Sequence, residues 1–224
     1  MMNSARFDPE WGAACQMRSQ IYGWFSTVFA GEMAPAAMAS CQEGGADHLW
    51  AVFTALGLGR QAEAVAAVFK AWAAHPEAPL ENAADFAALF LLEGRAAPLP
   101  YASHYLDGGG PLYGAPARAM RAFLASSPWR LDERFKEPED HLAVILGVLA
   151  QWSRDCGRVG DVAACAAQQE AYLDAALMPW VEQWQARMDA VDTLAFRYYP
   201  AVAALLVAFL HVDREYLQAC AEGE

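Results

Sequence analysis

The sequence lacks any stretch in which apolar and polar residues alternate for long enough to predict a β-strand. Val, Ile and Thr, which favour strands, are sparse, whereas alanine dominates the chain and favours helix. Charged residues amount to only 19%, against 56% hydrophobic residues. Such a chain is expected to fold around a large core rather than to remain disordered. Together these features predict an all-α globular protein.

An excess of positive charge is also missing, because the formal net charge is −12. DNA, RNA and anionic membranes are bound through basic patches, so the composition argues against all three. An acidic surface suits a basic ligand, but acidity alone also keeps many bacterial proteins soluble. The net charge therefore excludes partners without identifying one.

The chain has neither a CxxC pair nor an apolar run long enough to cross a bilayer. Its five cysteines are scattered and odd in number, and we expect small buried side chains in a reducing compartment rather than disulfides or a zinc site. The longest apolar stretch runs only from Tyr199 to Leu210. The start, MMNSARFDPEW, has no apolar run behind a basic head, so no signal peptide is expected. These features predict a cytoplasmic protein.

Helical periodicity, with its start and stop signals, predicts about ten helices. In the first of them Asp8 is the expected cap, Pro9 suits the first turn, and Gly31 ends the helix. The remaining helices are expected at residues 35–43, 47–56, 60–74, 81–93, 116–126, from 138 onward, 161–177, 179–191 and 193–220. The last one is expected to be kinked or broken near Pro200.

Two stretches are the least helical, a long loop at residues 94–115 and a shorter segment at residues 128–137. Loops as long as the first are uncommon inside compact domains and are often functional. Its glycine triplet, Gly108–Gly110, has neither the preceding strand nor the Lys-Ser/Thr of a phosphate-binding loop. A domain boundary is therefore expected near the second segment, and nucleotide binding is not expected at the first.

The segment Glu137-Pro138-Glu139-Asp140-His141 is one candidate site, because three carboxylates and a histidine could bind a metal or transfer protons. The alternative is a helix start in which Pro138 fits the first turn and the acids favour the positive helix N-terminus. Adjacent residues such as Asp140 and His141 project in different directions on a helix and do not easily share one ion. The local sequence favours the second interpretation.

The long loop holds a second candidate, Pro100-Tyr101-Ala102-Ser103-His104-Tyr105. Ser103 beside His104 suggests a hydrolase, but a nucleophilic serine sits on a glycine-flanked elbow in an α/β sheet, and that context is missing. Tyr101 and Tyr105 suit a loop that docks on a surface or lines a peptide groove. A packed structural loop is equally consistent with this pattern.

Taken in order, several short motifs resemble the TorD/DmsD family of redox-enzyme maturation chaperones. The sequence DFAALFL at Asp85–Leu91 is followed by PYASHY at Pro100–Tyr105 and by EPEDHL at Glu137–Leu142. The opening segment Arg18–Ala30 and the closing FRYYPAVAALLVAFLHVD are also typical of this family. Each motif is short, but their order and spacing are specific, and the resemblance covers essentially the whole chain.

The resemblance implies an all-α bundle of two helical subdomains joined by a hinge that carries the EPxDH motif. The expected divisions are an N-terminal subdomain at residues 1–130, a hinge at 131–141 and a C-terminal subdomain at 142–224. Family members bind the twin-arginine signal peptide and the apo form of a molybdoenzyme before export, and they assist cofactor insertion. They occur as monomers or domain-swapped dimers, and weak GTP binding is associated with the family. Nothing else in this sequence supports a nucleotide, and no cofactor of the protein's own is expected.

The family motifs imply a peptide site in this chain, since carboxylates suit arginines and aromatic rings supply apolar area. Pro138 is expected to be structural. The expected peptide-binding residues are Tyr101, Ser103, Tyr105, Glu137, Glu139, Asp140 and His141. No catalytic residue and no metal ligand is predicted.

Two other functions stay open. One is a helical interaction or oligomerisation module without a twin-arginine client. The other is a helical metalloenzyme that uses Glu137, Glu139, His141 and His104.

Overall fold

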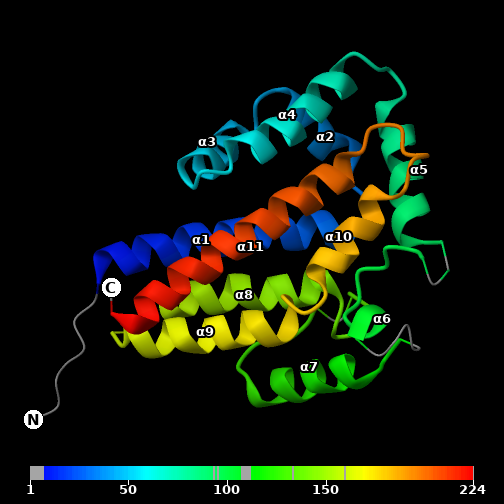
Figure 1. Ribbon diagram of the computed structural model, residues 1–224. Coiled ribbons are helices and arrows are strands. Elements are labelled where there is room, and N and C mark those ends of the chain that lie inside the picture. Colours follow the sequence, from blue (N-terminus) through cyan, green and yellow to red (C-terminus); the bar gives the residue numbers. More distant parts are fainter. Residues whose placement is uncertain are drawn as a thin grey trace, which may run out of the picture. The chain divides into compact units, whose positions relative to one another are not determined.

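The computed structural model describes residues 8–92, 94, 96–106, 112–132, 134–158 and 160–223 (Figure 1). Eleven helices lie in this part of the chain, which contains no β-strand, so the predicted all-α class is confirmed. The helices are α1 Pro9–Ala30, α2 Pro35–Gln42, α3 Asp47–Ala55, α4 Gly59–Ala73, α5 Ala78–Phe90, α6 Ser103–Leu106, α7 Ala115–Ser126, α8 Leu142–Cys156, α9 Val162–Ala176, α10 Val181–Asp189 and α11 Tyr198–Glu222. None of the described helices is long and apolar enough to cross a membrane.

Most helix boundaries agree with the sequence pattern to within a few residues, and three predictions need correction. The helix expected from Pro138 begins only at Leu142, because the residues before it form a turn. The predicted kink at Pro200 is absent, since α11 starts at Tyr198 and a proline in the first turn removes no helical hydrogen bond. The four-residue helix α6 lies inside the long loop that was expected to be irregular.

The contacts group the helices into two units, each assembled from separate stretches of chain. Unit 1 contains the described parts of Met1–Ala30, Tyr101–Trp180 and Asp213–Glu224, and unit 2 contains those of Gly31–Pro100 and Val181–Val212. The predicted subdomain boundaries and the hinge at residues 131–141 stay predictions. Gly108–Gly110 lie outside the described residues.

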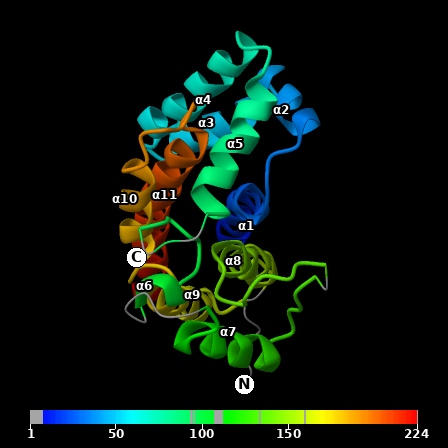
Figure 2. The same ribbon diagram turned by 90° about the vertical axis from the view of Figure 1, so that its right-hand side faces the viewer.

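In unit 1, α1 packs along α8, and α9 lies beside α8 on the other side (Figure 1). Figure 2 views α1 and α8 nearly end on and shows α7 on the side of α8 and α9 away from α1. The sequence places buried side chains on α1 at alternating intervals of four and three residues, which keeps them on one face of a helix. These residues are Trp11, Cys15, Arg18, Tyr22, Phe25 and Phe29.

Arg18 is the one charged residue in this series, and it forms an ion pair with Asp213 of the same unit. Its Nε and Nη2 donate to the two carboxylate oxygens of Asp213 at 2.5 and 2.9 Å, and Tyr22 Oη donates to the same carboxylate at 2.5 Å. Arg18 and Asp213 are almost completely buried, which makes this a desolvated ion pair. Burial raises the pKa of Tyr22 well above its usual value, and the Asp213 carboxylate raises it further.

Unit 2 has an aromatic core to which α4 and α11 both contribute. Trp72 of α4 packs on Tyr198 of α11 with ring centroids 4.8 Å apart, and Phe53 meets Phe209 edge to face at 6.2 Å. Asp85 in the DFAALFL motif accepts hydrogen bonds from the backbone N–H groups of Ala195 and Phe196, at 2.8 and 3.0 Å. This motif therefore fixes the turn that leads into α11.

The buried ion pair generates a stability prediction. Replacing Asp213 with alanine leaves the Arg18 guanidinium buried without its counter-charge, and we expect the free energy of unfolding to fall by about 3–5 kcal/mol. The matched control is Asp174→Ala, which breaks the part-exposed pair with Arg214, the residue next to Asp213. It should lose at most about 1 kcal/mol. Urea unfolding measures both losses, and equal losses would contradict a dominant role for the buried pair.

Candidate functional site

The PYASHY loop of unit 1 is held against the segment that precedes α8. The Ser103 backbone N–H and its hydroxyl both donate to Asp140 Oδ2, at 2.8 and 2.5 Å. The Ala102 N–H donates to the Asp140 backbone oxygen at 3.2 Å, so one residue anchors the loop through both its side chain and its main chain. The PYASHY loop and the EPEDHL motif, whose residues Ser103 and Asp140 are 37 positions apart in sequence, are thus in direct contact.

Tyr101 and Glu137 form a second link between the same two segments. The Tyr101 hydroxyl donates to Glu137 Oε2 at 2.6 Å. Burial of the phenol raises the pKa of Tyr101 well above its usual value, and the Glu137 carboxylate raises it further, so the hydroxyl stays protonated and acts as donor. Glu137 itself is exposed, and no cationic partner for it lies among the described residues.

His141 is the N-cap of α8, so the first residue of the helix is Leu142. Its Nδ1 accepts a hydrogen bond from the Ala143 N–H at 3.1 Å, and its extended backbone conformation suits this position. The ring lies edge to face with Tyr101 at 4.9 Å and with Phe135 at 5.3 Å. Burial lowers the pKa of His141 to about 4, so the imidazole is neutral at physiological pH.

The other two predicted peptide-binding residues lie next to different partners. Glu139 accepts two hydrogen bonds from the Arg121 guanidinium of α7, at 2.6 and 2.9 Å. Tyr105 stacks on Trp180 with ring centroids 5.3 Å apart. The structure thus joins five of the seven predicted residues in one cluster, with Glu139 and Tyr105 next to other neighbours.

The accessibility of these residues differs from what a ready-made arginine receptor needs. Asp140 and Ser103 are both 0% exposed, and their side chains are hydrogen-bonded to each other. Pro138 is also buried, as expected for a structural residue, and its backbone oxygen accepts from the His141 N–H at 3.0 Å. Among the carboxylates of the motif, only Glu137 is both exposed and without a cationic partner in the described structure. The assignment of Asp140 and His141 as peptide contacts stays a prediction.

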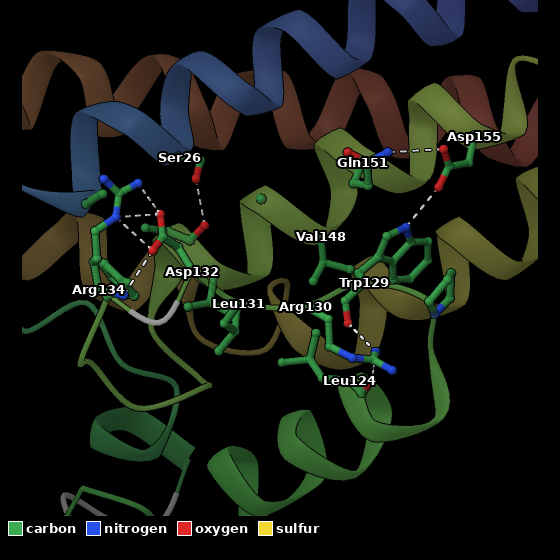
Figure 3. Close-up of a pocket in the computed structure, with 16 residues that line it drawn as sticks. Ser26, Leu124, Trp129, Arg130, Leu131, Asp132, Arg134, Val148, Gln151 and Asp155 are labelled. Carbon is green, nitrogen blue, oxygen red and sulfur yellow. Dashed lines mark hydrogen bonds and ion pairs between the residues drawn. The ribbon is translucent and has the colours of Figure 1, made fainter.

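Beside this cluster lies a groove of about 930 Å³ in unit 1, which we call the strap groove (Figure 3). Its floor is formed by α1 and α8. Its wall is formed by the strap, defined as the described residues 128–132, 134 and 135 between α7 and α8. Ala143, Val144, Gly147 and Val148 line it from α8, and Leu131 and Phe135 line it from the strap.

Small residues keep the floor of the strap groove open. A Cβ atom added at Gly147 would lie 3.4 Å from Ser26 Oγ, because α1 and α8 approach closely here. The Ser26 hydroxyl donates to the Ala143 backbone oxygen at 2.8 Å. Phe135 and Ala143 belong both to the groove lining and to the surroundings of His141. The EPxDH motif therefore shapes one end of the groove.

The polar groups at the rim of the strap groove already have partners (Figure 3). Asp155 accepts from Trp129 Nε1 at 2.9 Å and from Gln151 Nε2 at 3.1 Å. Arg134 pairs with Asp132, and Arg130 donates to the backbone oxygens of Ser127, just before the strap, and Trp129, within it. The hydrogen bond between Trp129 and Asp155 thus joins the strap to α8, and the other polar contacts are local to the strap.

Sequence reasoning did not identify the strap groove. Its lining comes from residues that are individually ordinary apolar side chains on three separate segments, and only the irregularity of residues 128–137 drew attention to the region. The anchor of the strap is the aromatic pair Trp129 and Trp152, whose ring centroids are 5.2 Å apart.

Some side chains that the metalloenzyme interpretation uses have hydrogen-bond partners in the described structure. No group of three or more His, Cys, Asp or Glu side chains in the described part of the chain is placed to hold a metal ion. His141 Nδ1 is already bonded to a backbone N–H, and Glu139 is bonded to a guanidinium. These atoms have structural partners of their own.

Comparison with known proteins gives the same result as the motifs. Residues 45–186 match the family model described as nitrate reductase delta subunit. A Chaperone protein TorD from a Psychrobacter species is 36% identical over 218 residues, covering 96% of this chain and 98% of the relative. The chain belongs to the TorD family. Proteins of the same name from Vibrio parahaemolyticus and Vibrio atlanticus are 32% and 29% identical, each across 90% of this chain and 95% of the relative.

Membership of the TorD family confirms the resemblance of the short motifs. The relatives are named as chaperones, which is a role without catalysis. In this TorD-family chain the matched region includes the PYASHY loop, the strap and α8, but not α1.

The neutral, buried His141 generates a pH prediction. The unfolded chain protonates this imidazole near pH 6.5 and the folded chain near 4, so between these values the unfolded state binds more protons. Stability should therefore rise with pH across this window and fall by about 3 kcal/mol from pH 6.5 to 4 on account of this group alone.

The control for the pH prediction is His141→Asn, which keeps an oxygen acceptor at the N-cap and removes the titration. Urea unfolding between pH 4 and 7 measures the difference. If both proteins lose the same stability on acidification, His141 is not the responsible group.

Proposed function

We propose that the protein is a cytoplasmic chaperone that binds the twin-arginine signal peptide and the apo form of a molybdoenzyme reductase before export. Membership of the TorD family supports a chaperone role. The chaperone holds the client while its molybdenum cofactor is inserted. The client carries the cofactor, and no group of this chain is assigned to the redox reaction.

The observation that carries this proposal is the strap groove, an open groove beside the family's EPxDH motif whose lining combines apolar side chains with polar ones. A signal peptide presents an apolar, helix-prone segment, which gains free energy when such a trough removes it from water. A volume of about 930 Å³ accommodates several apolar side chains of a peptide. The apolar segment is therefore assigned to the strap groove.

The paired arginines of the peptide need carboxylates that are exposed and have no cationic partner. Glu137 meets both conditions, since its one described hydrogen bond comes from the neutral Tyr101 hydroxyl. Asp155 is exposed as well and accepts only from neutral donors. Guanidinium groups bind such carboxylates with charge-assisted, often bidentate hydrogen bonds. Asp140, Ser103 and His141 are then positioning residues that hold the loop and the groove end in shape.

A direct test of the client is affinity purification of the tagged protein from its native host, followed by mass spectrometry. The proposal expects a molybdoenzyme precursor whose twin-arginine leader is uncleaved. Recovery of partners without such a leader, while the host's reductases are expressed, would favour an interaction module with a different client.

Peptide titration tests the site itself. The probe is a synthetic peptide with two adjacent arginines followed by an apolar segment, and calorimetry measures its dissociation constant. Leu131→Asn should weaken binding about fivefold to tenfold, because part of a leucine's apolar area no longer contributes. Glu137→Gln should weaken binding of the arginine peptide but change little for a version with two lysines, which cannot form the planar bidentate pair.

Leu80→Asn is the matched control, because Leu80 is 68% exposed on α5 in unit 2 and does not line the strap groove. It should leave the dissociation constant unchanged. Weaker binding by Leu80→Asn together with normal binding by Leu131→Asn would move the peptide site from the strap groove to α5.

A further inference from the structure

Two cysteines of unit 1, Cys156 and Cys165, lie where α8 leads into α9. Cys156 is the last residue of α8, and Cys165 lies in the first turn of α9, which begins at Val162. Only residues 157–161 connect the two helices, so α8 and α9 run in opposite directions beside each other (Figure 1). All cysteines of the chain are free thiols in this structure.

Two side-chain contacts fix how α8 and α9 are aligned. The Ser153 hydroxyl donates to Gln169 Oε1 at 3.2 Å, and the rings of Trp152 and Tyr172 meet edge to face at 5.7 Å. Toward the connection, one helical turn is a step of three or four residues forward on α8 and backward on α9. From Ser153 and Gln169 this step leads to the two cysteines. The alignment therefore places their side chains opposite each other.

The two thiols are close enough to influence each other's ionisation. Burial raises the pKa of Cys156. The pKa of Cys165 is raised to about 12, first by burial and then by the adjacent Cys156 sulfur. Both groups are protonated at neutral pH, and since the thiolate is the reacting form, we expect their reactions to be slow.

The cysteines differ in their access to solvent. Cys156 is only 4% exposed, whereas Cys165 is part-exposed. A dissolved reagent therefore reaches the Cys165 sulfur first. The buried sulfur of Cys156 lies behind it and is placed to react with the product that forms on Cys165.

We propose that Cys156 and Cys165 form a reversible internal disulfide by exchange with a low-molecular-weight disulfide. The Cys165 sulfur gives up its proton and attacks one sulfur of the reagent, which forms a mixed disulfide and releases half of the reagent as a thiol. The Cys156 sulfur, likewise deprotonated, then attacks the Cys165 sulfur, which closes the internal bond and releases the other half as a thiol. The protein loses two electrons and two protons, and the reagent gains them. The proposal does not depend on the proposed function, because neither cysteine lines the strap groove.

The test is incubation of the folded full-length protein with oxidised glutathione at mildly alkaline pH. Acid quenching, alkylation under denaturing conditions and peptide mapping follow. We expect two of the five thiols to be lost over hours, with Cys156 joined to Cys165. Excess reduced glutathione should restore both thiols. Retention of all thiols, or a glutathione adduct that persists on Cys165 of the unmodified protein, would overturn the proposal.

Two variants separate the roles of the two thiols. In Cys156→Ser no neighbouring thiol can displace the glutathione, so we expect a stable adduct on Cys165. Cys165→Ser changes a part-exposed residue, and circular dichroism should show the fold of the unmodified protein. This second variant should form no internal disulfide on the same timescale. If it loses two thiols as fast as the unmodified protein does, the proposed pair is wrong.

Cys220→Ser is the matched control, because it removes another part-exposed thiol of unit 1. It should form the disulfide between Cys156 and Cys165 as the unmodified protein does. A rival partner is the buried Cys15 of α1, whose Cβ would lie 3.1 Å from a Cβ added at Gly157. Peptide mapping that joins Cys15 to either cysteine in the unmodified protein would overturn the pairing inferred from the alignment of α8 and α9.

Discussion

The close packing of α1 against α8 is the constraint on which unit 1 depends. Three positions without a bulky side chain, Gly23, Gly147 and Gly157, lie where the two helices come nearest, and each would bring an added Cβ to within 4.0 Å of the neighbouring helix. The strap groove lies along this contact. A wider separation of the two helices would remove its floor.

A second constraint acts at the start of α8, where two family motifs form one structural joint. Asp140 uses its carboxylate to hold the Ser103 turn, and His141 uses its ring nitrogen to cap the helix. Burial keeps the imidazole neutral, and only a neutral imidazole can accept the hydrogen bond from Ala143. Through these two hydrogen bonds Asp140 and His141 hold the PYASHY loop and the start of α8 in place at one end of the strap groove. Glu137 of the same motif is exposed to solvent.

The polar side chains around the strap groove have partners within unit 1. Asp155 accepts from Gln151 and from Trp129 of the strap, and Arg134 pairs with Asp132. The apolar side chains of Leu131, Val144 and Val148 lie beside them in the groove lining.

The sequence by itself determined the all-α class, the start of α1 at its Asp8 cap, and the family, because helical periodicity, capping residues and ordered motifs are local signals. It also marked the residues that meet in the Ser103–Asp140 joint, although it could not say that they would be buried. Only the tertiary structure decided which charges are already used, as with Arg18 and Asp213, which lie 195 residues apart. The strap groove and the composition of the two units were likewise decided there, since each depends on contacts between segments whose separation in sequence leaves no local pattern.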